Sequence, residues 1–169
     1  MKKIILASTV VFCITVASAT PAFAGTGNTS TATGSATATI VAPIVLTHPV
    51  GAALNFGRFT TGTGGTVSVT AAGTGSVGSD VTFVPGSTNA ADSFTVAGDT
   101  SRAFAITTTG GTVTSGATNL AFTTTASAAS ATLSAGGTSS FTVGGTLTVS
   151  GTAPAGAYTG TYSATVTYN

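Results

Sequence analysis

The C-terminal residues 156–169 alternate between two sets of side chains, and this pattern constrains the fold more than any other feature of the sequence. One set consists of Tyr158, Gly160, Tyr162, Ala164, Val166 and Tyr168. The other consists of Thr159, Thr161, Ser163, Thr165, Thr167 and Asn169. Alternation with a period of two, rich in aromatic and β-branched residues, predicts a β-strand with one buried face. All three tyrosines of the protein lie on that face.

Short apolar groups recur along the rest of the chain, separated by turn signals and without helical periodicity. The predicted strands include 32–46, 54–59, 66–70, 81–84, 93–97, 102–108, 112–114 and 119–125. Gly110-Gly111 and Gly144-Gly145 each predict a two-residue hairpin turn. Pro43 predicts that the first strand lies at an edge or breaks there, because proline cannot donate to a ladder. Roughly nine short strands predict an all-β protein, an immunoglobulin-like antiparallel β-sandwich.

The N-terminus has the pattern of a secretory signal peptide. Lys2 and Lys3 precede an apolar run over residues 4–16, and Ala22-Phe23-Ala24 has the small-x-small form of a cleavage site. We therefore expect a signal peptide over 1–24, a flexible tail or donor segment over 25–35 and a β-sandwich domain over 36–169. Such a protein is exported through the periplasm to the cell surface or medium, with no integral membrane segment after signal removal.

The composition excludes several functional classes. Charged residues make up 4% of the chain, and after residue 24 they are Arg58, Asp80, Asp92, Asp99 and Arg102. So few basic residues cannot follow a phosphate backbone, so we expect no nucleic-acid partner. The single cysteine, Cys13, lies within the predicted signal, so the mature chain has no disulfide framework.

The chain is also poor in catalytic and metal-binding side chains. His48 is the only histidine, and we interpret it as a strand-end residue with ordinary hydrogen bonds. Asp80, Asp92 and Asp99 lie in turn-like contexts, where aspartate bonds its own backbone. Arg58, between two phenylalanines, is interpreted as solvated or locally bonded. We therefore predict no catalytic residue, no cofactor and no metal site.

Several segments resemble, in their order and spacing over about residues 36–169, one exported bacterial family. They are Ala42-Pro43-Ile44, Leu54-Asn55-Phe56-Gly57, Gly65-Thr66-Val67, Phe94-Thr95-Val96-Ala97-Gly98, Val143-Gly144-Gly145-Thr146-Leu147 and Gly156-Ala157-Tyr158-Thr159-Gly160-Thr161-Tyr162. The family is domain of unknown function 4402, which looks similar to spore-coat protein U and to archaic chaperone–usher pilin subunits. Gly156, fourteenth from the C-terminus, and the penultimate Tyr168 resemble the C-terminal motif of such pilins.

This resemblance implies a non-catalytic structural protein of the cell surface, a fimbrial or pilin-like subunit whose sandwich lacks one strand. A periplasmic chaperone and an usher are the implied partners, followed by self-association into a fibre through β-strand addition. The expected assembly strand carries Gly156, Tyr158, Tyr162, Val166 and Tyr168. The expected donor segment carries Ala38, Ile40, Ala42, Ile44 and Leu46. The alternative is a self-complete secreted adhesion or ligand-binding domain, in which 36–46 pairs within its own sheet.

Overall fold

The structure is a computed structural model that describes residues 27–169. Within this range the chain forms strands and turns and no helix, so no helix could cross a membrane there. The strands are β1 (Val45–Thr47), β2 (Phe59–Thr60), β3 (Gly64–Val69), β4 (Gly75–Ser79), β5 (Thr82–Phe83), β6 (Asp92–Ala97), β7 (Ala103–Ser115), β8 (Thr118–Ala126), β9 (Ser130–Thr132), β10 (Thr138–Ser150) and β11 (Thr159–Tyr168). All of them lie in the compact unit of residues 39–169, which confirms the prediction of an all-β domain.

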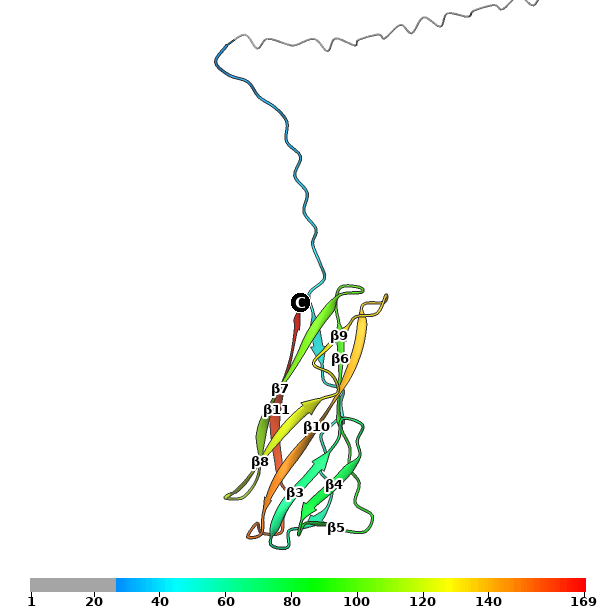
Figure 1. Cartoon of the computed structure of the whole chain (residues 1–169), viewed down its shortest axis with the longest axis vertical. Coiled ribbons are helices and arrows are strands. Elements are labelled where there is room, and N and C mark those ends of the chain that lie inside the picture. The colour runs from blue at the N-terminus through cyan, green and yellow to red at the C-terminus, as the bar shows by residue number, and fades with distance from the viewer. Residues whose placement is uncertain (1–26) are drawn as a thin grey trace, which may run out of the picture. The chain divides into compact units, whose positions relative to one another are not determined.

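One curled antiparallel sheet connects most of these strands, and β2 and β5 form a second, small sheet. The path of the large sheet is β1-β6-β10-β8-β7-β11, with β3 and β4 attached through β10 and β9 attached to β7. The long strand β10 pairs with β6 over residues 138–143 and with β3 over 145–150. Because β7 and β10 extend through both halves of the domain (Figure 1), the sheet folds over itself, consistent with the predicted sandwich.

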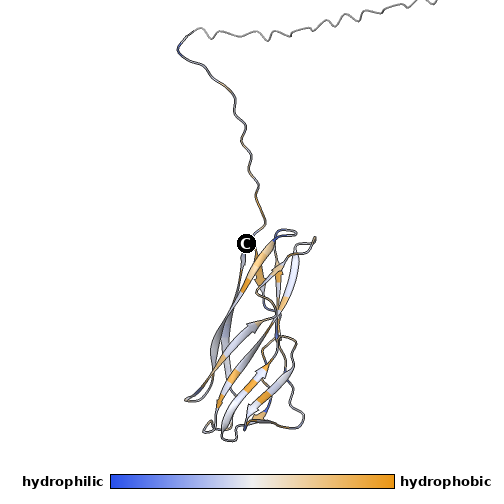
Figure 2. Cartoon of the chain, viewed as in Figure 1, coloured by the Kyte–Doolittle hydropathy of each residue, from blue (hydrophilic) through white to orange (hydrophobic). Residues whose placement is uncertain are grey.

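Two clusters of buried apolar side chains form the core. The first contains Phe56, Val67, Val69, Val81, Val113, Leu120, Phe122, Leu147 and Val149. The second contains Phe94, Val96, Phe104, Ile106, Leu133, Phe141 and Val143. Apolar positions lie along the strands of both halves of the domain (Figure 2), and Tyr162 of β11 packs against both clusters.

The two glycine pairs predicted to form hairpin turns lie inside strands instead. Gly110-Gly111 belongs to β7, and Gly144-Gly145 belongs to β10. A Cβ on Gly144 would overlap the Val69 carbonyl oxygen, and one on Gly145 would overlap that of Thr123. These glycines stand where neighbouring backbones approach too closely for a side chain. The prediction was wrong because a glycine pair allows such an approach as readily as it allows a turn.

The predicted strand over 32–46 is also much shorter in the structure. Only β1 forms there, and it pairs with β6 alone, so it is an edge strand as Pro43 predicted. Residues 27–43 are exposed and form no strand. Alanine, glycine and threonine dominate residues 32–39, so burying this segment would remove little apolar area from water, which explains the missing strand.

Candidate functional site

A large groove lies between β11 and the segment 52–61, which leads from β1 to β2. Its volume is about 1330 Å³, and it is partly open to solvent. Its apolar lining includes Leu54, Phe56, Phe59, Val113, Leu120, Phe122, Leu147, Val149, Tyr158, Tyr162 and Ala164. We call this feature the β11 groove. It is the candidate functional site because a large apolar concavity and the expected assembly strand meet there.

β11 forms one wall of the groove. Its even-numbered positions from Tyr162 to Tyr168 are half-buried and the positions between them are exposed, which confirms the predicted alternation. Among residues 27–169, β11 pairs with β7 and with no other strand. The second edge of β11 therefore carries backbone N–H and C=O groups without a strand partner, and such an edge can accept another strand.

The segment 52–61 forms the opposite wall, and side chains from elsewhere hold it in place. Asn55 forms an isolated bridge with Ala90, and the Asn89 side-chain amide donates a 2.7 Å hydrogen bond to the Phe56 carbonyl. Gly57 has a φ of +81° and its N–H donates to the Asn55 side chain at 2.8 Å. The segment 54–59, which was predicted to be a strand, is therefore mostly irregular. None of the described ladders joins it to β11.

The floor of the groove is made by aromatic and aliphatic side chains of the first cluster. The rings of Phe56 and Phe122 lie 5.9 Å apart, and those of Phe122 and Tyr162 lie 6.2 Å apart, both in edge-to-face contact. Leu147 and Val149 of β10 complete this surface. Edge-to-face packing fixes the rings against one another, so the floor is a preformed apolar surface. Covering it with apolar side chains removes that surface from water, which is favourable.

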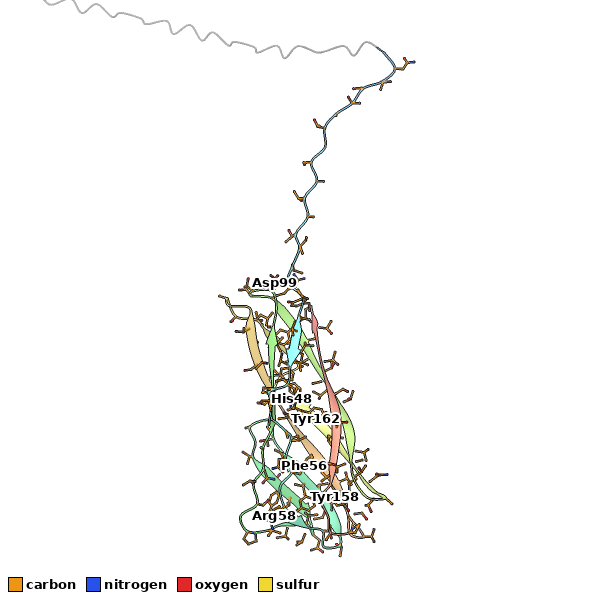
Figure 3. The ribbon with its side chains drawn as sticks, turned by 180° about the vertical axis from the view of Figure 1, so that it is seen from behind. His48, Phe56, Arg58, Asp99, Tyr158 and Tyr162 are labelled. Atoms are coloured by element: carbon orange, nitrogen blue, oxygen red, sulfur yellow. The ribbon has the colours of Figure 1, made fainter. Side chains whose placement is uncertain are left out.

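A polar cluster stands at one end of the groove. Asp92 of β6 is only 3% exposed, and its carboxylate has three hydrogen-bond partners. Its Oδ1 lies 2.7 Å from His48 Nε2 and accepts the Ser93 N–H at 2.8 Å, while its Oδ2 accepts the Tyr162 hydroxyl at 2.7 Å. In Figure 3, His48 and Tyr162 lie together midway along the domain, with Phe56, Tyr158 and Arg58 toward one end and Asp99 at the other.

This cluster joins three elements and shapes the electrostatics of the groove. His48 follows β1 in the chain, and the centre of its ring lies 4.9 Å from that of Phe94 in β6. Tyr162 belongs to β11. Burial, and then the hydrogen bond to Asp92, raises the pKa of Tyr162 above its ordinary value. The phenol therefore stays neutral and donates to the carboxylate, so the groove has an apolar floor and a polar end.

The predicted assembly strand divides between the groove and the second cluster. Gly156, Tyr158 and Tyr162 line the groove. Val166 and Tyr168 lie beyond it and pack against the second cluster. The Tyr168 hydroxyl accepts the Asp99 N–H at 2.7 Å and donates to the Ala42 carbonyl at 3.0 Å, so it ties the chain before β1 to the end of β11.

The predicted donor segment divides in the same way. Ile44 and Leu46 pack against the second cluster of their own chain, and Leu46 pairs with Val96 in the ladder between β1 and β6. The side chains of Ala38, Ile40 and Ala42 are exposed, with Ile40 at 98%. The structure thus assigns the two C-terminal donor positions to the domain's own core.

The other charged residues within 27–169 lie outside the polar cluster. Asp80 lies in a turn, as the sequence predicted, but its carboxylate accepts the N–H of the distant Thr63 at 2.8 Å rather than an N–H of its own turn. Asp99 Oδ2 lies 3.8 Å from Arg102 Nη1. The guanidinium carbon of Arg102 lies over the Tyr168 ring, 5.0 Å from its centre. The exposed Arg58 lines the groove. No group of three His, Cys, Asp or Glu side chains suited to a metal ion occurs among residues 27–169.

Sequence reasoning missed the burial of Asp92. The prediction placed it in a turn, whereas the structure places it at the start of β6 with its side chain inside the domain. A signal was present: Asp92, Phe94 and Val96 share one face of the same alternation. The position of His48 at a strand end was predicted correctly, but its partner was not, because that partner is 44 residues away.

Comparisons with known proteins match most of the described domain. A family model described as "Domain of unknown function (DUF4402)" matches residues 44–168. No curated protein matches the chain, and no solved structure matches it.

Proposed function

The chain belongs to the DUF4402 family of domains of unknown function, and we propose that it is a non-catalytic structural protein of the cell surface that assembles by β-strand addition at the β11 groove. In this proposal an extended segment of a neighbouring molecule lies beside β11. Backbone hydrogen bonds to the unpaired strand edge provide affinity, and alternate side chains packed on the groove floor provide specificity. The observation that carries the proposal is the coincidence of a free strand edge with an apolar groove.

The size of the groove supports a peptide segment rather than a small molecule. Its volume of about 1330 Å³ exceeds the roughly 300–1,000 Å³ that is usual for small-molecule sites. Of the nine residues from Gly156 to Ala164, which include the start of β11, eight line the groove. At about 3.3 Å per residue, this length accommodates an extended segment of roughly eight residues.

The location and partners complete the proposal. The signal peptide predicted over 1–24 lies outside the described residues, and it supports export to the periplasm and then to the cell surface. A periplasmic chaperone and an usher would protect and place the open edge of β11, since unprotected edges associate nonspecifically. Repeated addition would produce a fimbrial fibre.

One observation favours the alternative of a self-complete adhesion or ligand-binding domain. β1 already pairs with β6, and Ile44 and Leu46 already cover part of the second cluster. In that case the groove would be a binding surface for a ligand rather than a place for a structural strand.

The non-catalytic proposal is supported by the chemistry of the polar cluster. The hydroxyl that meets Asp92 is the phenol of Tyr162, whose raised pKa keeps it protonated and a poor nucleophile.

The experiment appends a strand to the full mature chain. A linker of about six flexible residues after Asn169 can return to the level of Ala164, since extended residues span at most about 3.3–3.6 Å each. It is followed by eight residues that alternate Val or Phe with Thr. We expect a monomer whose melting temperature rises by at least about 5 °C, because linkage raises the effective concentration of the strand.

The matched control replaces two of the inward-facing apolar residues of the appended strand with Asp, because a charge forced onto an apolar floor is costly. This control should melt like the unmodified chain. If the unmodified chain is a stable monomer and both additions leave its melting temperature unchanged, strand addition is wrong and the self-complete domain takes its place.

A further inference from the structure

We propose that Asn89 is a positioning residue that keeps the β11 groove open, because it holds the wall formed by residues 52–61 away from β11. Asn89 acts through this wall, since neither Asn89 nor Ser87 is among the residues of 27–169 that line the groove. The inference rests on the proposed function, because it identifies what keeps the groove ready to receive a strand. It concerns the receiving molecule, so it is the same for any strand that is added.

The loop 84–91, which joins β5 to β6, holds the wall through its backbone. The Asn89 side-chain amide donates a 2.7 Å hydrogen bond to the Phe56 carbonyl. Two residues further along the wall, the Arg58 N–H donates to the Ser87 hydroxyl, also at 2.7 Å. Because Asn89 and Ser87 lie outside the lining of the groove, these bonds hold the wall from the side that an added strand would not contact.

Asn89 is itself confined between the wall and the large sheet. A Cβ on Gly57 of the wall would overlap the Ser87 hydroxyl and the Asn89 amide. On the other side, a Cβ on Gly75 at the start of β4 would also overlap the Asn89 side chain. Since β4 pairs with β3, the amide of Asn89 connects the wall to the large sheet and has little room to move.

The wall has to be held because the groove is an uncovered apolar surface. Phe122, Leu147 and Val149 line it, and removing apolar area from water is favourable. The wall carries the apolar side chains of Leu54 and Phe59, and none of the described ladders joins it to β11. A shift of the wall toward β11 would therefore cover this surface and close the groove.

The hydrogen bond from Asn89 opposes that shift. Phe56 is buried, so its carbonyl would lose its partner where water has little access, and such a loss is unfavourable. The groove therefore stays open in the absence of a strand. An added strand then meets a preformed site and does not have to displace the wall, and avoiding this reorganisation strengthens binding.

The test uses the strand of alternating Val or Phe and Thr appended to the full mature chain. Its effect on the melting temperature is measured in the wild type and in three variants. Asn89→Asp retains the size of the side chain but lacks the N–H donor, and Asn89→Ala removes the side chain. The control, Thr88→Ala, removes an exposed side chain from the same loop. Each protein is measured with and without the appended strand, so a general loss of stability cancels in the difference.

We expect the strand to raise the melting temperature by at least about 5 °C in the wild type and in Thr88→Ala. In both Asn89 variants the rise should be less than about half as large, because part of the binding free energy is used to reopen the groove. Asn89→Asp decides the matter if Asn89→Ala does not fold. An equal rise in the wild type and Asn89→Asp would overturn the positioning role and leave strand addition intact, even if the variant itself melts at a lower temperature. No rise in the wild type would overturn the proposed function, and this inference with it.

Discussion

The Tyr162 hydroxyl donates a hydrogen bond to Asp92. It should contribute more to the free energy of unfolding than any other tyrosine hydroxyl in the β11 groove. The Tyr162→Phe substitution removes one oxygen atom and leaves the ring in place between Phe94 and Phe122. The carboxylate that loses this donor is 3% exposed, so water cannot readily replace the bond. Hydrogen bonds to charged groups contribute about 1.5–3 kcal/mol, and we expect a loss of about 2 kcal/mol in the free energy of unfolding.

The matched control is Tyr158→Phe, which removes the same atom from the same wall. The Tyr158 hydroxyl donates to the Pro154 carbonyl at 2.9 Å in an exposed position, where water can take its place. We expect this control to cost less than about 0.5 kcal/mol. In thermal unfolding followed by circular dichroism, Tyr162→Phe should melt about 6–10 °C lower than the wild type and the control within about 2 °C of it. Equal melting temperatures for the two variants would refute the argument that the Asp92 carboxylate is desolvated.

The same pair of variants tests the pKa of Tyr162. Burial and the hydrogen bond to Asp92 raise this pKa above the ordinary value of 10.0. The unfolded chain therefore releases the proton near pH 10 while the folded chain retains it, so the stabilisation is complete below about pH 10 and is lost as the pH rises further. Tyr162→Phe should lose less stability than Tyr158→Phe between pH 9 and pH 11. A parallel loss in both variants would contradict the direction of the shift.

Three further predictions concern other parts of the chain. Gly144→Ala should destabilise the domain by more than about 2 kcal/mol, since the new Cβ would overlap the Val69 carbonyl, whereas Gly136→Ala meets only the Ser134 hydroxyl at 3.6 Å and should be nearly neutral in denaturant titration. Mass spectrometry of the exported protein should find a mature N-terminus at Gly25, and a chain that still contains Lys2 and Lys3 would contradict the predicted signal. Addition of EDTA should leave the melting temperature unchanged, and a large fall would show that a bound metal stabilises the native state.

Local sequence patterns were sufficient to predict the fold class and the one-sided burial of β11. The alternation in residues 158–168 predicted the one-sided burial of β11, and the same period places Phe94 and Val96 inward in β6. The order of the short motifs also predicted the DUF4402 family, which the match over residues 44–168 confirms. These features depend on neighbouring residues, because a period of two determines which side chains share a face.

The groove and its polar end depended on tertiary structure. The alternation of β11 does not specify that its second edge has no strand partner among residues 27–169, nor that segment 52–61 stands opposite to it. The partners of Asp92 come from His48 and Tyr162, which are 44 and 70 residues away. The glycines of β10 likewise acquire their role from the backbones of β3 and β8.

The physical reason is the non-local character of β structure. Within a strand, the side-chain period follows from backbone geometry alone, so the sequence by itself determined the buried face of β11 and the fold class. Which strands lie side by side depends on contacts between residues far apart in the chain, whose free energy is gained only when the whole sheet has formed. Only the tertiary structure therefore decided that Asp92 is buried, that the glycine pairs lie within strands and that β11 borders an open apolar groove.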